Sequence, residues 1–151
     1  MKNLKRCFFA IALLLLLNNC SNTKKQTQVT GGSEMLYANQ WNLTELNSTP
    51  VTEGKAHLLF FPGQVTRVSG NAGCNNLTGT VELTGVNLIH FLPLATTRMA
   101  CIEATREQEF TKALGQVNNW SIVNNQLLLN NGKILLARLN AAPVKPTNLV
   151  Q

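Results

Sequence analysis

Short segments of alternating apolar and polar residues, separated by turns, fill most of the chain after residue 37. In residues 40–46, Trp41 and Leu43 alternate with Asn42 and Thr44, which is typical of a half-buried strand. Such a strand has one face toward a core and one toward water. Further strands are expected at residues 55–61, 64–69, 78–83, 87–91, 120–124, 126–130 and 133–139.

Turn residues between these segments indicate antiparallel hairpins. Pro62-Gly63, Thr84-Gly85 and Asn131-Gly132 each separate two expected strands. Gly and Asn are favoured in such turns because they adopt positive φ at low cost. No βαβ rhythm links the strands, so the sequence predicts an α+β fold with an antiparallel sheet.

One helix is expected, beginning near residue 105. An apolar stripe with i, i+3, i+4, i+7 spacing is formed by Phe110, Ala113, Leu114 and Val117. The charged residues of this segment, including Glu107, fall on other faces and are expected to face water. We expect the helix to pack as a lid or plug on the sheet.

The N-terminus is typical of a targeting signal. Lys2, Lys5 and Arg6 precede an unbroken apolar run at residues 8–17. This run is too short for a membrane span, which takes about 20 apolar residues, but it fits the apolar region of a signal peptide. Residues 1–19 are therefore expected to be a signal peptide that is removed on export.

The residues that follow the apolar run resemble a bacterial lipobox, in which a Leu lies three positions before the lipidated Cys. Leu17 and Cys20 fit this pattern, whereas Asn18 and Asn19 depart from it, because small residues are usual there. We expect lipid attachment at Cys20, with each buried methylene of the acyl chains contributing about 0.8 kcal/mol to membrane binding. Lipoproteins of the inner membrane usually carry Asp after the Cys. Ser21 therefore implies the periplasmic face of the outer membrane. The alternative is an ordinary secretory peptide with an incidental Cys.

Polar segments flank the expected domain. Residues 20–37 contain two adjacent glycines and no apolar periodicity, so they are expected to be a lipidated, flexible tether. Residues 140–151, with Pro143 and Pro146, are expected to be a disordered tail. The folded domain is expected to span residues 38–139, a length that supports only a marginal core.

Cys74 and Cys101 remain once the leader cysteine and Cys20 are set aside. An even pair in an exported chain indicates a disulfide. The bridge would close a loop of about 28 residues and add about 3–4 kcal/mol of stability in the chain-entropy model. Metal ligation and a nucleophilic thiol stay open as alternatives. Zinc usually takes four ligands with paired spacing, and this chain adds only His57 and His90, far apart in sequence.

The charge of the chain excludes one class of partner. The formal net charge is +6, and removal of the leader with its three basic residues leaves about +3. No cluster of Lys and Arg accompanies this excess, so nucleic acid is not expected as a partner. No sequence motif indicates a metal or another cofactor, and none is expected.

Two motifs resemble signatures of the META domain family, the HslJ-like heat-inducible proteins. Residues 69–75 (SGNAGCN) resemble the family's G-x-x-G-C-N motif through Gly70, Gly73 and Asn75. Residues 96–101 (TTRMAC) resemble its T-x-M-A-C element through Thr97 and Met99. The resemblance extends over roughly residues 38–139, which is nearly the whole expected domain.

This resemblance implies a compact, antiparallel, barrel-like sheet with one packed helix. Members of the family are commonly envelope proteins linked to heat or antibiotic stress, and the family has no established catalytic residues. The implied function is non-catalytic binding or scaffolding in envelope maintenance. The expected partners are the membrane, through the lipid anchor, and an unknown envelope protein or apolar ligand.

Other functions are kept as alternatives. The implied fold is similar to that of pilot lipoproteins, so an acyl-chain-binding or pilot-like assembly factor for an envelope complex is one of them. A periplasmic inhibitor module is another. An enzyme would use Cys74 as nucleophile with His57 or His90 as base. No catalytic motif with a mechanism appears in the sequence, so no catalytic residue is expected.

Overall fold

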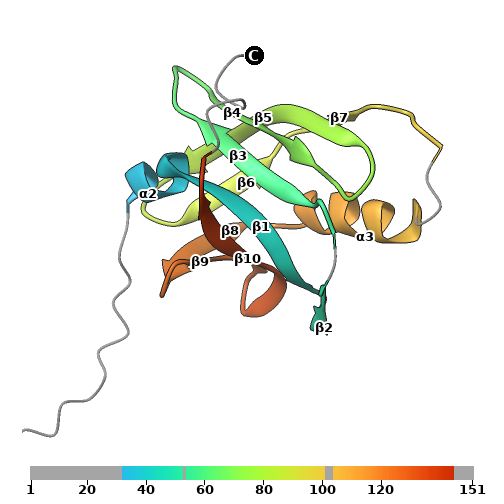
Figure 1. The fold of residues 1–151 in the computed structure, drawn as a ribbon. Helices are drawn as coiled ribbons and strands as arrows, with labels where there is room; N and C mark the ends of the chain where they lie inside the picture. Colours follow the sequence, from blue (N-terminus) through green and yellow to red (C-terminus); the bar gives the residue numbers. More distant parts are fainter. Residues whose placement is uncertain (1–31, 53, 101–103, 145–151) are drawn as a thin grey trace, which may run out of the picture.

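The computed structural model describes residues 32–52, 54–100 and 104–144. Within these ranges the chain forms two helices and ten strands (Figure 1). Neither helix within these ranges has the length and hydropathy that a membrane span requires. The elements are α2 (Ser33–Ala38), β1 (Asn39–Leu46), β2 (Thr49–Pro50), β3 (His57–Phe61), β4 (Thr66–Asn71), β5 (Asn76–Thr84), β6 (Leu88–Phe91), β7 (Ala95–Thr96), α3 (Ala104–Leu114), β8 (Asn119–Val123), β9 (Gln126–Asn131) and β10 (Ile134–Pro143). The expected signal peptide, Cys20 and Cys101 lie outside the described residues.

The strands form one antiparallel sheet that closes on itself. In the described part of the chain, the neighbours around the ring are β1, β3, β4, β5, β6, β8, β9 and β10, and β10 pairs with β1 again. The short strands β2 and β7 pair with β1 and β5 outside this ring. This confirms the α+β fold with an antiparallel sheet that the strand pattern predicts, and the barrel with a packed helix that the family resemblance implies.

Alternate residues of the strands fill the barrel. In β1, Trp41 and Leu43 are buried while their neighbours are half-exposed. In β9, Leu127 and Leu129 repeat this pattern. Removal of such apolar surface from water contributes roughly 25 cal/mol per Å² and is the main stabilising term of the fold.

The two helices lie at opposite ends of the barrel (Figure 1). From α2, Leu36 enters the core, and its carbonyl accepts a hydrogen bond of 2.9 Å from Nε1 of Trp41. The apolar stripe predicted for the second helix is buried at the other end: Phe110, Ala113, Leu114 and, just after α3, Val117. Both helices are too short to be stable alone, so packing on the barrel must hold them.

The seam between β1 and β10 joins the first and last strands of the barrel. Among the described residues it has seven register pairs, from Asn39 with Pro143 to Leu46 with Ala137. A β-bulge interrupts the pairing between Leu43 and Glu45. Hydrogen bonds along most of both strands therefore close this side of the sheet.

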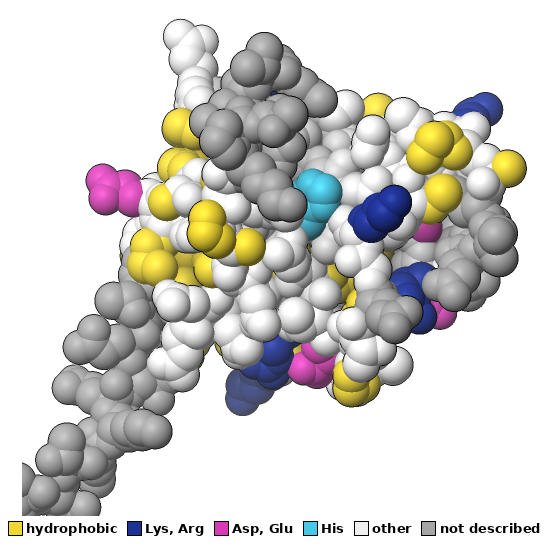
Figure 2. Space-filling view, in the orientation of Figure 1, with side chains coloured by type: hydrophobic (Ala, Val, Ile, Leu, Met, Phe, Trp, Pro, Cys, Tyr) yellow, Lys and Arg dark blue, Asp and Glu magenta, His cyan; other side chains and the backbone are white. Residues whose placement is uncertain are grey.

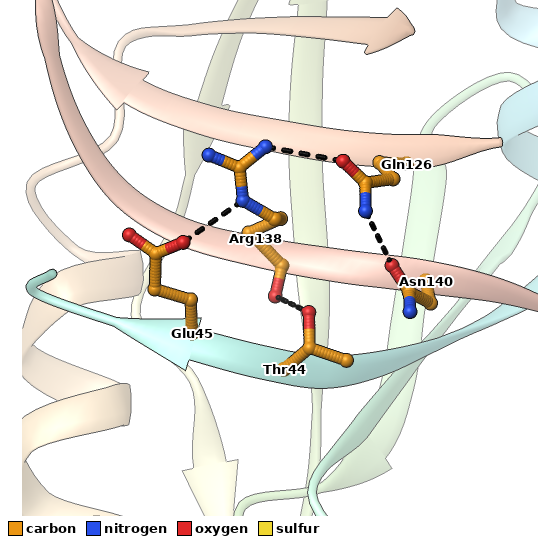
Figure 3. A network of polar contacts seen from close by, with 5 residues as sticks. All are labelled: Thr44, Glu45, Gln126, Arg138 and Asn140. Carbon is orange, nitrogen blue, oxygen red and sulfur yellow. Dashed lines mark hydrogen bonds and ion pairs between the residues drawn. The ribbon is translucent and has the colours of Figure 1, made fainter. Parts of the chain in front are cut away.

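A polar network covers the outer face of the same seam (Figure 3). Arg138 contacts Glu45 through an ion pair of 2.9 Å between Nε and Oε2, and its Nη1 donates to Oε1 of Gln126 at 3.1 Å. Gln126 donates in turn to Asn140, and the hydroxyl of Thr44 donates to the carbonyl of Arg138. The network thus links β1, β9 and β10 by side chains as well as by backbone.

The seam between β6 and β8 is much shorter. Its described residues form one register pair, Leu88 with Asn119. Two backbone hydrogen bonds flank this pair, from the Ile89 nitrogen to the Asn118 carbonyl at 3.3 Å and from the Trp120 nitrogen to the Asn87 carbonyl at 2.9 Å. Past this crossing, the end of β6 lines a small pocket together with α3 rather than with a strand.

The folded unit is longer at both ends than the sequence predicts. Helix α2 lies inside the segment expected to be tether, and β10 continues to Pro143, inside the segment expected to be tail. A six-residue helix is too short to show a helical period, and the contact between Leu36 and Trp41 that supports it is not visible in the sequence. The extra residues of β10 are ordered by pairing with the start of β1.

Candidate functional site

The G-x-x-G-C-N motif covers the end of β4 and the loop that leads to β5. The Ala72 nitrogen donates to the carbonyl of Asn75 at 2.8 Å, which closes the loop. The side chain of Asn71 supports it from β4: its Oδ1 accepts from the Gly73 nitrogen at 2.8 Å, and its Nδ2 donates to the Cys74 carbonyl at 3.2 Å. The loop is therefore fixed by its own hydrogen bonds.

Both glycines of the motif are required by the backbone. At Gly70, a Cβ atom would overlap the backbone oxygen of His57 on the neighbouring strand β3. At Gly73, φ is +129°, a value that residues with side chains rarely adopt. The two glycines thus permit close strand approach at one position and the turn of the loop at the other.

Asn75 joins this loop to two other segments of the chain. Its side chain is only 5% exposed. Its Oδ1 accepts hydrogen bonds from the Thr97 hydroxyl at 2.8 Å and from the Met99 nitrogen at 2.7 Å. Its Nδ2 donates to both carboxylate oxygens of Glu107, at 2.9 and 3.1 Å, and its backbone nitrogen donates to Oε2 at 2.8 Å. We call Asn75, Thr97, Met99 and Glu107 the motif cluster.

The T-x-M element is held beside the loop by further bonds. Besides donating to Asn75, the Thr97 hydroxyl accepts from the Asn76 nitrogen at 3.1 Å, and the Thr97 nitrogen donates to the Asn76 carbonyl at 3.0 Å. Strand β7, directly before Thr97, pairs with the start of β5. The structure therefore brings the two sequence motifs together, although they are more than 20 positions apart.

Glu107 is the member of the motif cluster that the sequence does not predict. It was expected to face water, but it is half-buried and accepts three hydrogen bonds from Asn75. That expectation is wrong, because the β4–β5 loop covers this side of α3. The available signal was its position in the first turn of the helix, where the helix dipole favours a carboxylate.

Cys74 is disulfide-bonded. Its expected partner, Cys101, lies outside the described residues, so that pairing stays a prediction. A sulfur in a disulfide is neither a thiolate nucleophile nor a metal ligand. A cavity of about 290 Å³ lies beside it and is lined in part by Gly73, Arg106 and Glu107.

The two histidines do not line the cavity beside Cys74. His57 lies on the outer face of the sheet, with Nδ1 at 2.7 Å from the Lys55 carbonyl. His90 lies on β6, opposite Glu82 of β5, and lines the small pocket next to α3. Neither histidine therefore shares that cavity with Cys74.

A cavity of about 1000 Å³ opens at the end of the barrel that carries α2. We call it the barrel mouth. Its apolar floor includes Val81, Leu83 and Trp120, and the tips of the β3–β4 and β5–β6 hairpins form its rim. The mouth-lining residues are Gly32, Ser33, Tyr37, Gly63, Gln64, Val65, Thr66, Val81, Glu82, Leu83, Thr84, Gly85, Val86, Leu88, Leu92 and Trp120. The sequence does not predict this cavity, because its lining comes from four separate segments.

The barrel and its motif cluster agree with a known family. The META domain model matches residues 34–142, from α2 almost to the end of β10. The chain belongs to the META domain family. In this META domain, Gly70, Gly73, Asn75, Thr97 and Met99, through which the sequence resembles the family, lie in one hydrogen-bonded region.

A solved structure agrees with the fold of this META domain. One NMR structure is 25% identical and aligns over 73% of this chain and 95% of that one, with a TM-score of 0.55. A second NMR structure, of a protein from Burkholderia xenovorans, is 20% identical over 73% of this chain and 86% of that one, with a TM-score of 0.48. No curated protein matches the chain.

Proposed function

We propose that this META domain protein is a lipoprotein on the periplasmic face of the outer membrane. In this proposal it acts by non-catalytic binding or scaffolding, in envelope maintenance under heat or antibiotic stress. Membership of the META family supports an envelope-associated role. The apolar run at residues 8–17 and the lipobox-like Cys20 support export and anchoring.

The observation that carries the non-catalytic role is the arrangement of the motif cluster. Catalytic groups converge on a space in which a reacting atom can lie. Here the polar groups of Thr97, Met99 and Glu107 converge instead on the buried amide of Asn75. The motif residues therefore act as a staple for the fold, which leaves the surfaces of the barrel for binding.

The lipid anchor is tested by the intact mass of the protein and by rescue of a deletion strain. In a strain that lacks the gene, the full chain should restore survival under heat or an antibiotic, and the protein from the membrane fraction should begin at an acylated Cys20. Cys20→Ala should abolish acylation and rescue. Cys7→Ala, a matched change in the leader, should preserve both. An unacylated wild-type protein would contradict the anchor.

The non-catalytic role is tested with the two histidines. A His57→Ala, His90→Ala double variant removes both candidate general bases. It should keep full rescue of the deletion strain, because neither side chain belongs to the motif cluster. Loss of rescue by a variant that is acylated and folded, as judged by mass and circular dichroism, would point to catalysis instead.

A further inference from the structure

Three exposed apolar side chains stand on the rim of the barrel mouth. Val86, at the tip of the β5–β6 hairpin, is 93% exposed, and Leu88 beside it is 51% exposed. Val65, from the β3–β4 hairpin, is 55% exposed. Figure 2 shows hydrophobic side chains over the end of the molecule that carries α2, and a second group on the side of β7. Single exposed apolar residues are ordinary, but a group around one opening indicates an interaction surface.

The chemistry of the mouth favours an apolar occupant. Below the rim, the floor of Val81, Leu83 and Trp120 continues the apolar surface inward. Glu82 is the one charged side chain among the lining residues that the structure describes. A mouth of this composition attracts hydrocarbon rather than a charged peptide or an anionic headgroup.

The position of the mouth in the chain indicates which hydrocarbon it meets. Gly32, where the described chain begins, lines the mouth. Cys20 precedes it by about 12 residues, and such a segment spans at most about 40 Å when fully extended. An acylated Cys20 would therefore keep the mouth close to the bilayer that holds its lipid. A short tether raises the effective concentration of the domain at that surface, so weak apolar contacts suffice for docking.

We infer that the barrel mouth docks on the bilayer, with Val65, Val86 and Leu88 inserted among the acyl chains at its surface. This inference rests on the lipid anchor of the proposed function and adds an orientation to it. A tether alone leaves the domain free to rotate, whereas an apolar rim on one end fixes that end toward the membrane. The opposite end, with α3 and the motif cluster, then faces the periplasm (Figure 1).

A tryptophan at the rim reports this orientation. The full, acylated chain with Val86→Trp is reconstituted into vesicles of phosphatidylethanolamine and phosphatidylglycerol with brominated acyl chains. Its added emission, relative to wild type, should be blue-shifted and quenched by bromine. Thr49→Trp is the matched control, because Thr49 is exposed on β2, at the end of β1 away from α2. Its emission should be neither shifted nor quenched.

A second set of variants separates docking from anchoring. With Val65→Asn and Leu88→Asn added, Val86→Trp should still float with the vesicles but lose its shift and quenching. Unquenched Val86→Trp in a protein that is acylated and vesicle-bound overturns the docking and leaves the anchor standing. Quenching of Thr49→Trp alone means that the domain lies with the other end down. Lipid carried away from vesicles in the mouth would identify a carrier instead. If Cys20 proves unacylated by mass, the anchor fails and the docking with it.

Discussion

The barrel is closed in two different ways at two of its seams. Between β1 and β10, the described residues form seven register pairs, and a polar network covers them (Figure 3). Between β6 and β8, they form one register pair. The shorter seam lies where the chain leaves α3 and enters β8. A sheet with few backbone bonds at one seam needs another fastening there, and we infer that α3 and the motif cluster supply it.

The polar network over the β1–β10 seam and the motif cluster also differ in their exposure to water. Arg138 and Glu45 are 32% and 26% exposed, and ion pairs that water reaches contribute little to stability. Asn75 is buried, and the removal of a buried group with several partners leaves those partners unsatisfied. We therefore expect the stability of the barrel to depend far more on the motif cluster than on the network of Figure 3.

The largest loss of stability is expected when the buried aromatic side chain of α3 is truncated. Phe110→Ala leaves a cavity in the core and should lower the free energy of unfolding by about 3–5 kcal/mol, as measured by urea denaturation. Ile134→Ala, at an exposed position of β10, should change it by less than about 0.5 kcal/mol. Equal effects of the two substitutions would mean that α3 does not support the barrel.

Removal of the central amide of the motif cluster tests the comparison itself. Asn75→Ala removes the side-chain acceptor of the Met99 nitrogen and the two side-chain bonds to the Glu107 carboxylate, while the backbone bond from residue 75 to Glu107 remains. It should lower the free energy of unfolding by about 3 kcal/mol. Gln126→Ala removes two side-chain bonds of the partly exposed network and should lower it by less than about 1 kcal/mol. A larger loss for Gln126→Ala than for Asn75→Ala would refute the account of the two seams.

A smaller loss of stability is expected when the Glu107 carboxylate is replaced by an amide. Glu107→Gln keeps one oxygen that can accept from Asn75, but its amide nitrogen then faces a donor. We expect a loss of about 1–2 kcal/mol in the free energy of unfolding. Glu109→Gln, on an exposed position of the same helix, should leave it unchanged within about 0.5 kcal/mol. A loss for Glu109→Gln as large as that for Glu107→Gln would show that the effect is general to acidic residues of α3.

The smallest effect is expected at the well-paired seam. Arg138→Met removes the ion pair with Glu45 and the bond to Gln126 but keeps much of the aliphatic stem. The free energy of unfolding should change by less than about 1 kcal/mol. A loss of several kcal/mol would show that the network, and not the backbone pairing, closes this seam.

Much of this fold is predictable from local patterns. Alternation of period 2 identifies β1 around Trp41 and Leu43, and the stripe at Phe110 and Leu114 identifies α3, because these signals reflect which face of each element is buried. Turn chemistry identifies the hairpin at Asn131-Gly132. Strands β2 and β7, with two residues each, are too short for any alternation to be detected.

The remaining features depend on contacts between distant segments. Asn39 pairs with Pro143 across the chain, and neither residue carries a strand signal of its own. Asn75 and Glu107 are 32 positions apart, and only its place in the first turn of α3 distinguishes Glu107 from the acidic residues that face water. The barrel mouth likewise has no local signature, because its lining is assembled only when the barrel closes.

Hydrogen exchange of wild-type protein and the Asn75→Ala variant tests most directly whether the motif cluster fastens the weak seam. In the variant, amides of α3 and of the β6–β8 crossing, such as those of Ile89 and Trp120, should lose protection. Amides between β1 and β10 should keep theirs, because their backbone pairing does not involve Asn75. Equal loss of protection at both seams, or none at the β6–β8 crossing, would contradict the account.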